Sequence, residues 1–289
     1  MDDTSQNIFT EGLSLYTQVL KFPLLYKVTQ YNEINMKGMT LNVTKTEFDF
    51  NIVSFNKIDE GAIIHIKMGN HRLLEYKGIF KKFIDFMNLF NVPFTDIQLR
   101  LNSSGIPIEV LNQPEIFTRW MNLREGELKK NLTDNSVISI IEGADKDFSD
   151  SLQAIKDSLF YQFLLPSVYG ERSQKPIHKV IVQSQLYQSE KFPVVIEDNF
   201  ISSTPQEVKF IQAGRFNIDR SKLETLYDKQ YKAICNDAKF DYNVLYQAKY
   251  RYLTRYGVMR DCIAEFLEDT ANKSIISKQT FNIQFIKNN

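Results

Sequence analysis

Residues 242–256 read YNVLYQAKYRYLTRY, and this stretch decides the expected fold. Every even-numbered position holds tyrosine, valine, alanine or threonine, whereas lysine and arginine fall on odd positions. A β-strand places alternate side chains on opposite faces, and tyrosine and threonine favour strands, so the stretch is predicted to be a strand. Gly257 would also suit a helix C-cap and 258–268 has helical apolar spacing, so a helix stays open as an alternative across 242–268.

Several other segments show the same alternation. Phe48, Phe50 and Ile52 alternate with polar residues, and a turn at 102–105 separates two further alternating runs. These patterns predict antiparallel strands in both halves of the chain. The predicted strands are 26–35, 39–54, 61–68, 97–101, 106–110, 180–183, 194–196, 208–216 and 281–285.

Apolar residues spaced three and four apart predict long helices between these strands. The clearest is 71–91, whose apolar face is expected to bury Phe80, Phe83 and Met87. If that face belongs to the core, Phe83→Ala should destabilise the protein by roughly 3–5 kcal/mol. Other helices are predicted at 8–20, after Pro114, from Phe148 to Phe163 and from Leu223 to Ile234.

The expected fold is α+β, with curved antiparallel β-sheets in both halves and long amphipathic helices packed on one face. At about 150 residues per domain, a chain of 289 residues suggests one large or two ordinary domains. The stretch 166–176 contains two prolines and a glycine and is the best candidate for a linker. We therefore expect an N-terminal α+β region at 1–165 and a C-terminal α+β region at 177–289, or else one continuous domain. This layout is loosely similar to half-barrel carriers that wrap a helix in a curved sheet, although no motif supports a family.

The charge balance and the N-terminal sequence bear on partners and location. With 35 basic and 35 acidic side chains the net charge is zero, which disfavours binding to nucleic acid. The first residues, MDDTSQNIF, are acidic where a secretory signal would be basic, and no apolar run is long enough to be a transmembrane segment. We expect a cytoplasmic protein, with export still open if a signal once preceded this sequence. Cys235 and Cys262 are expected to be buried thiols, although a single disulfide stays open.

The sequence carries no motif typical of catalysis, nucleotide binding or metal binding. GxGxxG, GxxxxGK[ST], GxSxG, HExxH and CxxC are all absent. His65, His71 and His178 are too few and too scattered for a zinc site, and the acidic run 145–150 lacks the glycine and closing glutamate of an EF-hand. No metal and no cofactor are therefore expected. The alternative is a hydrolase that uses dispersed Asp, Glu or His residues.

The aromatic row within 242–256 is the strongest candidate for a binding site. Tyr242, Tyr246, Tyr250 and Tyr252 would share one face of a strand. A dry core seldom holds so many phenol hydroxyls in one row because each needs a partner, whereas a cavity wall tolerates them. Core packing is the simpler explanation, but we predict that part of the row borders a pocket or partner surface. The expected function is non-catalytic binding of an apolar small molecule or a protein partner.

Overall fold

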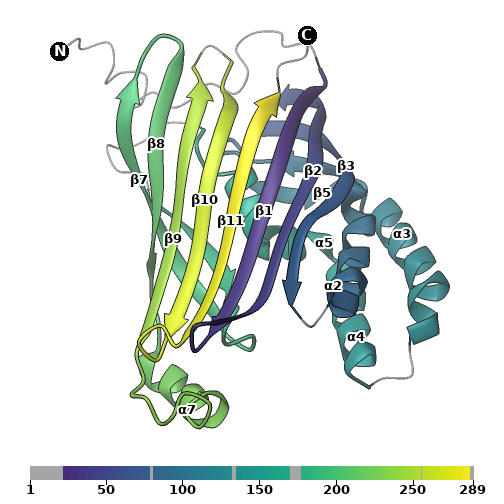
Figure 1. Cartoon of the computed structure of the whole chain (residues 1–289). Coiled ribbons are helices and arrows are strands. Elements are labelled where there is room, and N and C mark those ends of the chain that lie inside the picture. Colours follow the sequence, from purple (N-terminus) through teal and green to yellow (C-terminus); the bar gives the residue numbers. More distant parts are fainter. Residues whose placement is uncertain (1–21, 79–80, 132–134, 170–176, 255, 287–289) are drawn as a thin grey trace.

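The structure, a computed structural model, describes residues 22–78, 81–131, 135–169, 177–254 and 256–286. Its main feature is an antiparallel sheet of eleven strands, in the spatial order β5-β4-β3-β2-β1-β11-β10-β9-β8-β7-β6 (Figure 1). The strands are β1 Leu24–Met36, β2 Met39–Ile58, β3 Gly61–Gly78, β4 Asp96–Leu101, β5 Pro107–Val110, β6 Ile177–Gln183, β7 Lys191–Ser203, β8 Glu207–Phe216, β9 Tyr242–Leu253, β10 Val258–Thr270 and β11 Ile275–Ile286.

Strands that are adjacent in the sheet are also adjacent in sequence, except at the centre, where β1 pairs with β11. That pairing runs from Leu25 opposite Ile286 to Met36 opposite Ile275. The pairing joins β1–β5 and β6–β11 into one continuous surface. Strands from both halves of the chain therefore share one sheet.

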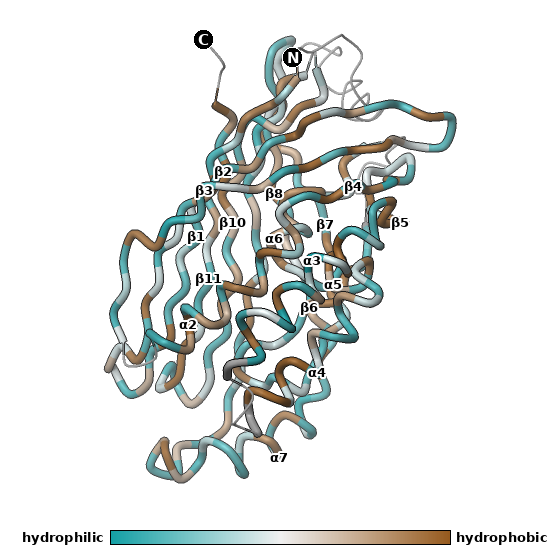
Figure 2. The backbone as a smooth tube through the Cα atoms, turned by 90° about the vertical axis from the view of Figure 1, so that its right-hand side faces the viewer, coloured by the Kyte–Doolittle hydropathy of each residue, from teal (hydrophilic) through white to brown (hydrophobic). Residues whose placement is uncertain are grey.

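The helices lie in the connections after β3, β5 and β8 and are short. Figure 2 shows α3, α4 and α5 on one side of the curved sheet, with α7 beyond one end of its strands. The longest described helix, α4, has 15 residues. The helices are α2 Lys81–Asn88, η1 Leu89–Thr95, α3 Gln113–Gly126, η2 Leu128–Asn131, α4 Asn135–Ser149, α5 Ser151–Asp157, α6 Leu159–Leu164 and α7 Arg220–Gln230. None of the described helices is long and apolar enough to cross a membrane.

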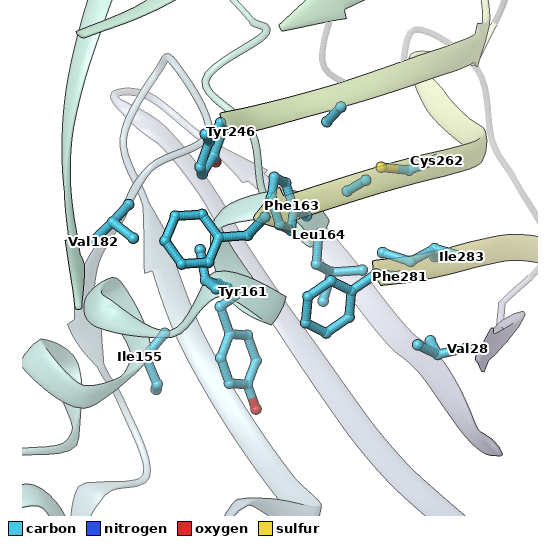
Figure 3. Packing of buried hydrophobic residues seen from close by; sticks show 14 of the residues in the cluster. Val28, Ile155, Tyr161, Phe163, Leu164, Val182, Tyr246, Cys262, Phe281 and Ile283 are labelled. Carbon is cyan, nitrogen blue, oxygen red and sulfur yellow. The ribbon is translucent and has the colours of Figure 1, made fainter. Parts of the chain in front are cut away.

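The core is organised around α6, against which the sheet packs from several directions. The Phe163 ring lies 4.7 Å from the ring of Tyr246 on β9 and 5.6 Å from that of Phe281 on β11 (Figure 3). The Phe160 ring contacts Phe48 on β2 at 5.3 Å and also reaches Phe281 at 6.2 Å. One short helix therefore touches strands on both sides of the β1–β11 junction, because the sheet curves around it.

The prediction of an α+β fold with separate curved sheets in both halves and long helices is wrong. One eleven-stranded antiparallel sheet runs through both halves, and its strands reach 20 residues in β2. The helix predicted at 8–20, residue Phe80 and residues 170–176 of the predicted linker lie outside the described residues.

Of the helix predicted at 71–91, residues 81–91 are helical, in α2 and η1, and a β-bulge explains why 71–78 also looked like a helix in the sequence. The register of β3 against β2 shifts so that Leu73 pairs with Thr46 and Glu75 with Lys45, which leaves Leu74 unpaired. A bulge adds one residue to a strand and breaks the alternation of faces. Leu73 and Tyr76, three residues apart, are consequently both half-buried while Leu74 is exposed, which imitates helical spacing.

The predicted burial of Phe83 and Met87 is also wrong. β3 continues to Gly78, and the helix that follows it, α2, has eight residues and no buried side chain. Phe83 is 49% exposed and Met87 is 37% exposed. Phe83→Ala is therefore not expected to create a core cavity.

Candidate functional site

A large cavity lies between the sheet and the helices. Its volume is about 1100 Å³. One wall comes from β1, β2, β3 and β11, and the opposite wall comes from α2, η1, α4, α5 and α6.

One part of the cavity is lined by aromatic rings from both walls. Phe48 and Phe281 come from the sheet, and Phe160 of α6 lies between them at 5.3 and 6.2 Å. On the helical side, the rings of Phe94 and Phe148 lie 5.1 Å apart. Apolar surface of this kind stabilises the hydrocarbon part of a ligand by removing it from water.

A second part of the cavity wall is polar but uncharged. Its side chains come from β1, β2 and β11 and from the residues next to β6, and we call them the amide row. The amide row consists of Gln30, Asn32, Asn42, Thr44, Thr46, Gln185 and Gln279.

The side chains of one histidine, His71, and two aspartates, Asp147 and Asp157, also line the cavity. The imidazole of His71 stacks on the ring of Phe48 at 4.9 Å, and burial lowers the pKa of His71. Asp157 is paired with Lys191, whose Nζ lies 2.6 Å from its Oδ2. Burial raises the pKa of Asp147, and the nearby Asp157 carboxylate raises it further while Lys191 opposes the shift.

The structure confirms that 242–253 is a strand and shows where its tyrosines lie. Tyr242, Tyr246, Tyr250 and Tyr252 are all at most 2% exposed on the inner face of β9. The Tyr242 hydroxyl donates to Glu268, and the Tyr250 hydroxyl donates to the carbonyl of Phe163 at 3.2 Å.

None of these four tyrosines lines the large cavity. Tyr252 lines a second pocket of about 30 Å³, together with Tyr169 and Met259. A ligand-binding role for the row stays a prediction, and the large cavity is formed by other residues.

Removing the Tyr250 hydroxyl tests how the row is held. Tyr250→Phe should lower the free energy of unfolding by about 1 kcal/mol, because the buried carbonyl of Phe163 loses its hydroxyl donor. Urea unfolding of the two proteins measures the difference. Unchanged stability together with weaker ligand binding would instead place Tyr250 at a binding surface.

The other residues considered in the sequence have structural partners. His65 lies 2.9 Å from Asp96, away from the cavity lining, and His178 lies half-buried on β6. The acidic run at 145–150 belongs mostly to α4, and its Asp145 accepts a hydrogen bond of 2.8 Å from the indole of Trp120. Within the described ranges, no group of three or more His, Cys, Asp or Glu side chains is placed to hold a metal ion.

Both cysteines are buried free thiols, as expected from the sequence. Burial raises the pKa of the Cys262 thiol strongly, and the neighbouring Asp261 carboxylate adds to the shift. A thiol in this environment stays protonated and is a poor nucleophile.

Comparison with known proteins gives little information on identity. No protein-family profile matches the sequence. The chain is 28% identical over 165 residues to pheromone-regulated membrane protein 2 of Saccharomyces cerevisiae, and the match covers 54% of this chain. The chain spans about a quarter of that relative, since the match covers 23% of the yeast protein.

Among solved structures, a lipovitellin structure that describes lipid–protein interactions aligns with 92% of this chain and 25% of its own. The TM-score is 0.45 and the sequence identity is 8%. A similarity at this level carries neither the fold nor the function of lipovitellin to this protein.

Proposed function

We propose that this protein binds an apolar or amphipathic small molecule, without catalysis, in the cavity between the sheet and the helices. The observation that carries the proposal is the cavity itself, with a volume of about 1100 Å³ and aromatic side chains on both walls. Small-molecule sites usually measure about 300–1,000 Å³ and are lined mainly by apolar groups. A cavity at the upper end of this range suits a ligand with long hydrocarbon chains.

The hydrolase alternative has no comparable support. A general base needs a hydrogen-bonded partner or a nucleophile within reach. In the part of the chain that the structure describes, His71 stacks on Phe48 and makes no hydrogen bond to a carboxylate, and the His65–Asp96 pair does not line the cavity. The hydrolase remains a hypothesis from the sequence.

Filling the cavity tests the proposal directly. Ala154 on α5 lines the cavity. The preceding residue, Gln153, is exposed and does not line the cavity. We expect Ala154→Trp to reduce binding of the neutral apolar dye Nile red at least about tenfold, because the indole occupies ligand volume. Gln153→Trp adds the same side chain outside the cavity and should bind the dye as the wild type does.

The measurement is a fluorescence titration of the full chain after removal of bound lipid by solvent extraction. Far-UV circular dichroism of each variant checks that it is folded. Mass spectrometry of the extract should show lipid-sized molecules that co-purify with the wild type and are depleted from Ala154→Trp. Absence of dye binding by the wild type, or equal binding by both tryptophan variants, would remove the cavity as the binding site.

A further inference from the structure

The polarity of the inner sheet surface changes on three neighbouring strands, at the same level on β1 and β2 and one same-face position further along on β11. On β1 the buried Val28 is followed on the same face by Gln30, on β2 Phe48 is preceded by Thr46, and on β11 Phe281 is preceded by Gln279. The cavity wall is therefore apolar at one end of the strands and polar at the other, so that it matches a molecule with one polar end.

The register of the strands makes the amide row continuous. Asn32 on β1 lies opposite Thr44 on β2 and opposite Gln279 on β11, so all three side chains point to the same face. The Asn32 amide donates to the Thr44 hydroxyl at 3.1 Å, and the Gln279 amide donates to the Gln185 side-chain carbonyl at 3.0 Å. Since each primary amide carries two N–H donors and an acceptor, these bonds leave further hydrogen-bonding capacity towards the cavity.

One member of the row has a buried acceptor without a partner. Asn42 is 8% exposed and lines the cavity, and its Oδ1 accepts no hydrogen bond from the described residues. Burying an unpaired polar group is unfavourable. This oxygen is itself buried and lies beside Gly78, so a ligand hydroxyl or N–H would reach it only after the Asn42 amide rotates towards the cavity.

The charges around the cavity disfavour an anionic ligand. Among the described lining residues there is no lysine or arginine, while Asp147 and Asp157 are carboxylates. Lys191 lies nearby but is already paired with Asp157 at 2.6 Å. A phosphate or carboxylate placed here would lose its hydration without gaining a cationic partner.

We infer that the amide row selects ligands whose polar end is an uncharged hydrogen-bonding group, such as the hydroxyl and ester groups of a neutral glyceride, over ligands with an anionic head. This inference rests on the proposed function, since it names the class of molecule that the cavity takes. Hydrocarbon chains would lie against Phe48, Phe160 and Phe281, and the neutral head would meet Asn32, Asn42 and Gln279.

The experiment compares lipids that share chains and differ in their heads. The delipidated full chain is loaded with Nile red, which is then displaced by dioleoylglycerol, by dioleoyl phosphatidic acid or by a dioleoyl lipid with a trimethylammonium head, each delivered from cyclodextrin. We expect dioleoylglycerol to displace the dye at a concentration at least about tenfold lower than phosphatidic acid, which corresponds to one well-made polar contact. The cationic lipid reports whether Asp147 and Asp157 attract a positive head.

Two variants test whether the amide row is responsible. Asn42→Leu and, separately, Thr44→Val should reduce the preference for dioleoylglycerol over phosphatidic acid about fivefold, the loss of roughly one hydrogen bond. Thr29→Val is the matched control, because Thr29 lies on β1 next to Gln30, on the opposite face, and does not line the cavity. Two independent variants keep the test informative if one of them fails to fold.

The outcomes separate this inference from the proposed function. If phosphatidic acid displaces the dye as well as dioleoylglycerol does, the selectivity is wrong while the binding cavity stands. An unchanged preference in both Asn42→Leu and Thr44→Val would likewise reject the amide row as the head-group site. Failure of the wild type to bind the dye and all three lipids would reject the proposed function itself.

Discussion

Phe163→Ala should lower the free energy of unfolding by roughly 3–5 kcal/mol, the usual cost of truncating a fully buried aromatic side chain. Phe163 has no exposed surface, and its ring lies against Tyr246 on β9 and Phe281 on β11. The contacts come from two strands, β9 and β11, that are separated by β10 in the sheet, so the space left by the ring cannot close by movement of one strand. Urea unfolding monitored by tyrosine and tryptophan fluorescence measures the loss.

Phe83→Ala is the matched control for this substitution. Its side chain is 49% exposed on α2, and surface truncations usually change stability by about 0.5 kcal/mol or less. A loss of several kcal/mol in Phe83→Ala, or of less than about 1 kcal/mol in Phe163→Ala, would mean that the core is not centred on α6.

Glu268→Ala should be the other strongly destabilising substitution, with an expected loss of at least about 3 kcal/mol. Glu268 on β10 is fully buried and accepts hydrogen bonds from the hydroxyl of Ser184 at 2.6 Å, from the backbone N–H of Gln185 at 2.5 Å and from the hydroxyl of Tyr242. Alanine would leave several buried donors without an acceptor, at roughly 1–3 kcal/mol each. The same bonds hold the backbone of Gln185, whose side chain belongs to the amide row, so ligand binding should weaken as well.

Glu268→Gln separates the hydrogen bonds from the charge. Burial raises the pKa of Glu268, and its hydrogen bonds only partly oppose the shift. Because its pKa is raised in the folded state, Glu268 contributes its full stabilisation only at a pH below its unfolded pKa of about 4.3. This stabilisation by Glu268 is lost as the pH rises through its folded pKa. The wild type should therefore lose stability relative to Glu268→Gln as the pH rises from about 4 towards neutrality.

Unfolding curves of both proteins at a series of pH values measure this difference. Because other carboxyl groups titrate equally in the two proteins, their effects cancel in the comparison. A difference that is constant with pH, or that grows in favour of the wild type at higher pH, would contradict a raised pKa.

The sequence predicted local structure better than it predicted how the parts assemble. The alternation in 242–256 identified β9 and its single aromatic face, because period two is a property of one strand and needs no knowledge of its neighbours. The same reasoning failed at 71–78, where the unpaired Leu74 shifts the alternation and produces a spacing of three, whereas 81–91 is helical as predicted. A bulge is defined by the partner strand, which the sequence of β3 alone does not show.

The candidate site was not identified from the sequence for a related reason. Gln30, Asn32 and Gln279 belong to no motif, and uncharged amides on a strand are ordinary surface residues when the fold is unknown. The usable signal was that Tyr26, Val28, Gln30 and Asn32 fall on one face, so an apolar face becomes polar midway along a strand. Only the pairing of β1 with β2 and β11 brings three such transitions side by side, within one same-face position of one another.

The pairing of β1 with β11 has a consequence for synthesis on the ribosome. β1 leaves the exit tunnel first among the described strands, and its central partner β11 emerges more than two hundred residues later. Until then β1 and β10 each present an unpaired strand edge, and such edges recruit strands from other chains. Contacts so distant in sequence also slow folding. Nascent chains of this protein are therefore expected to depend on chaperones that bind extended segments until β11 has been translated.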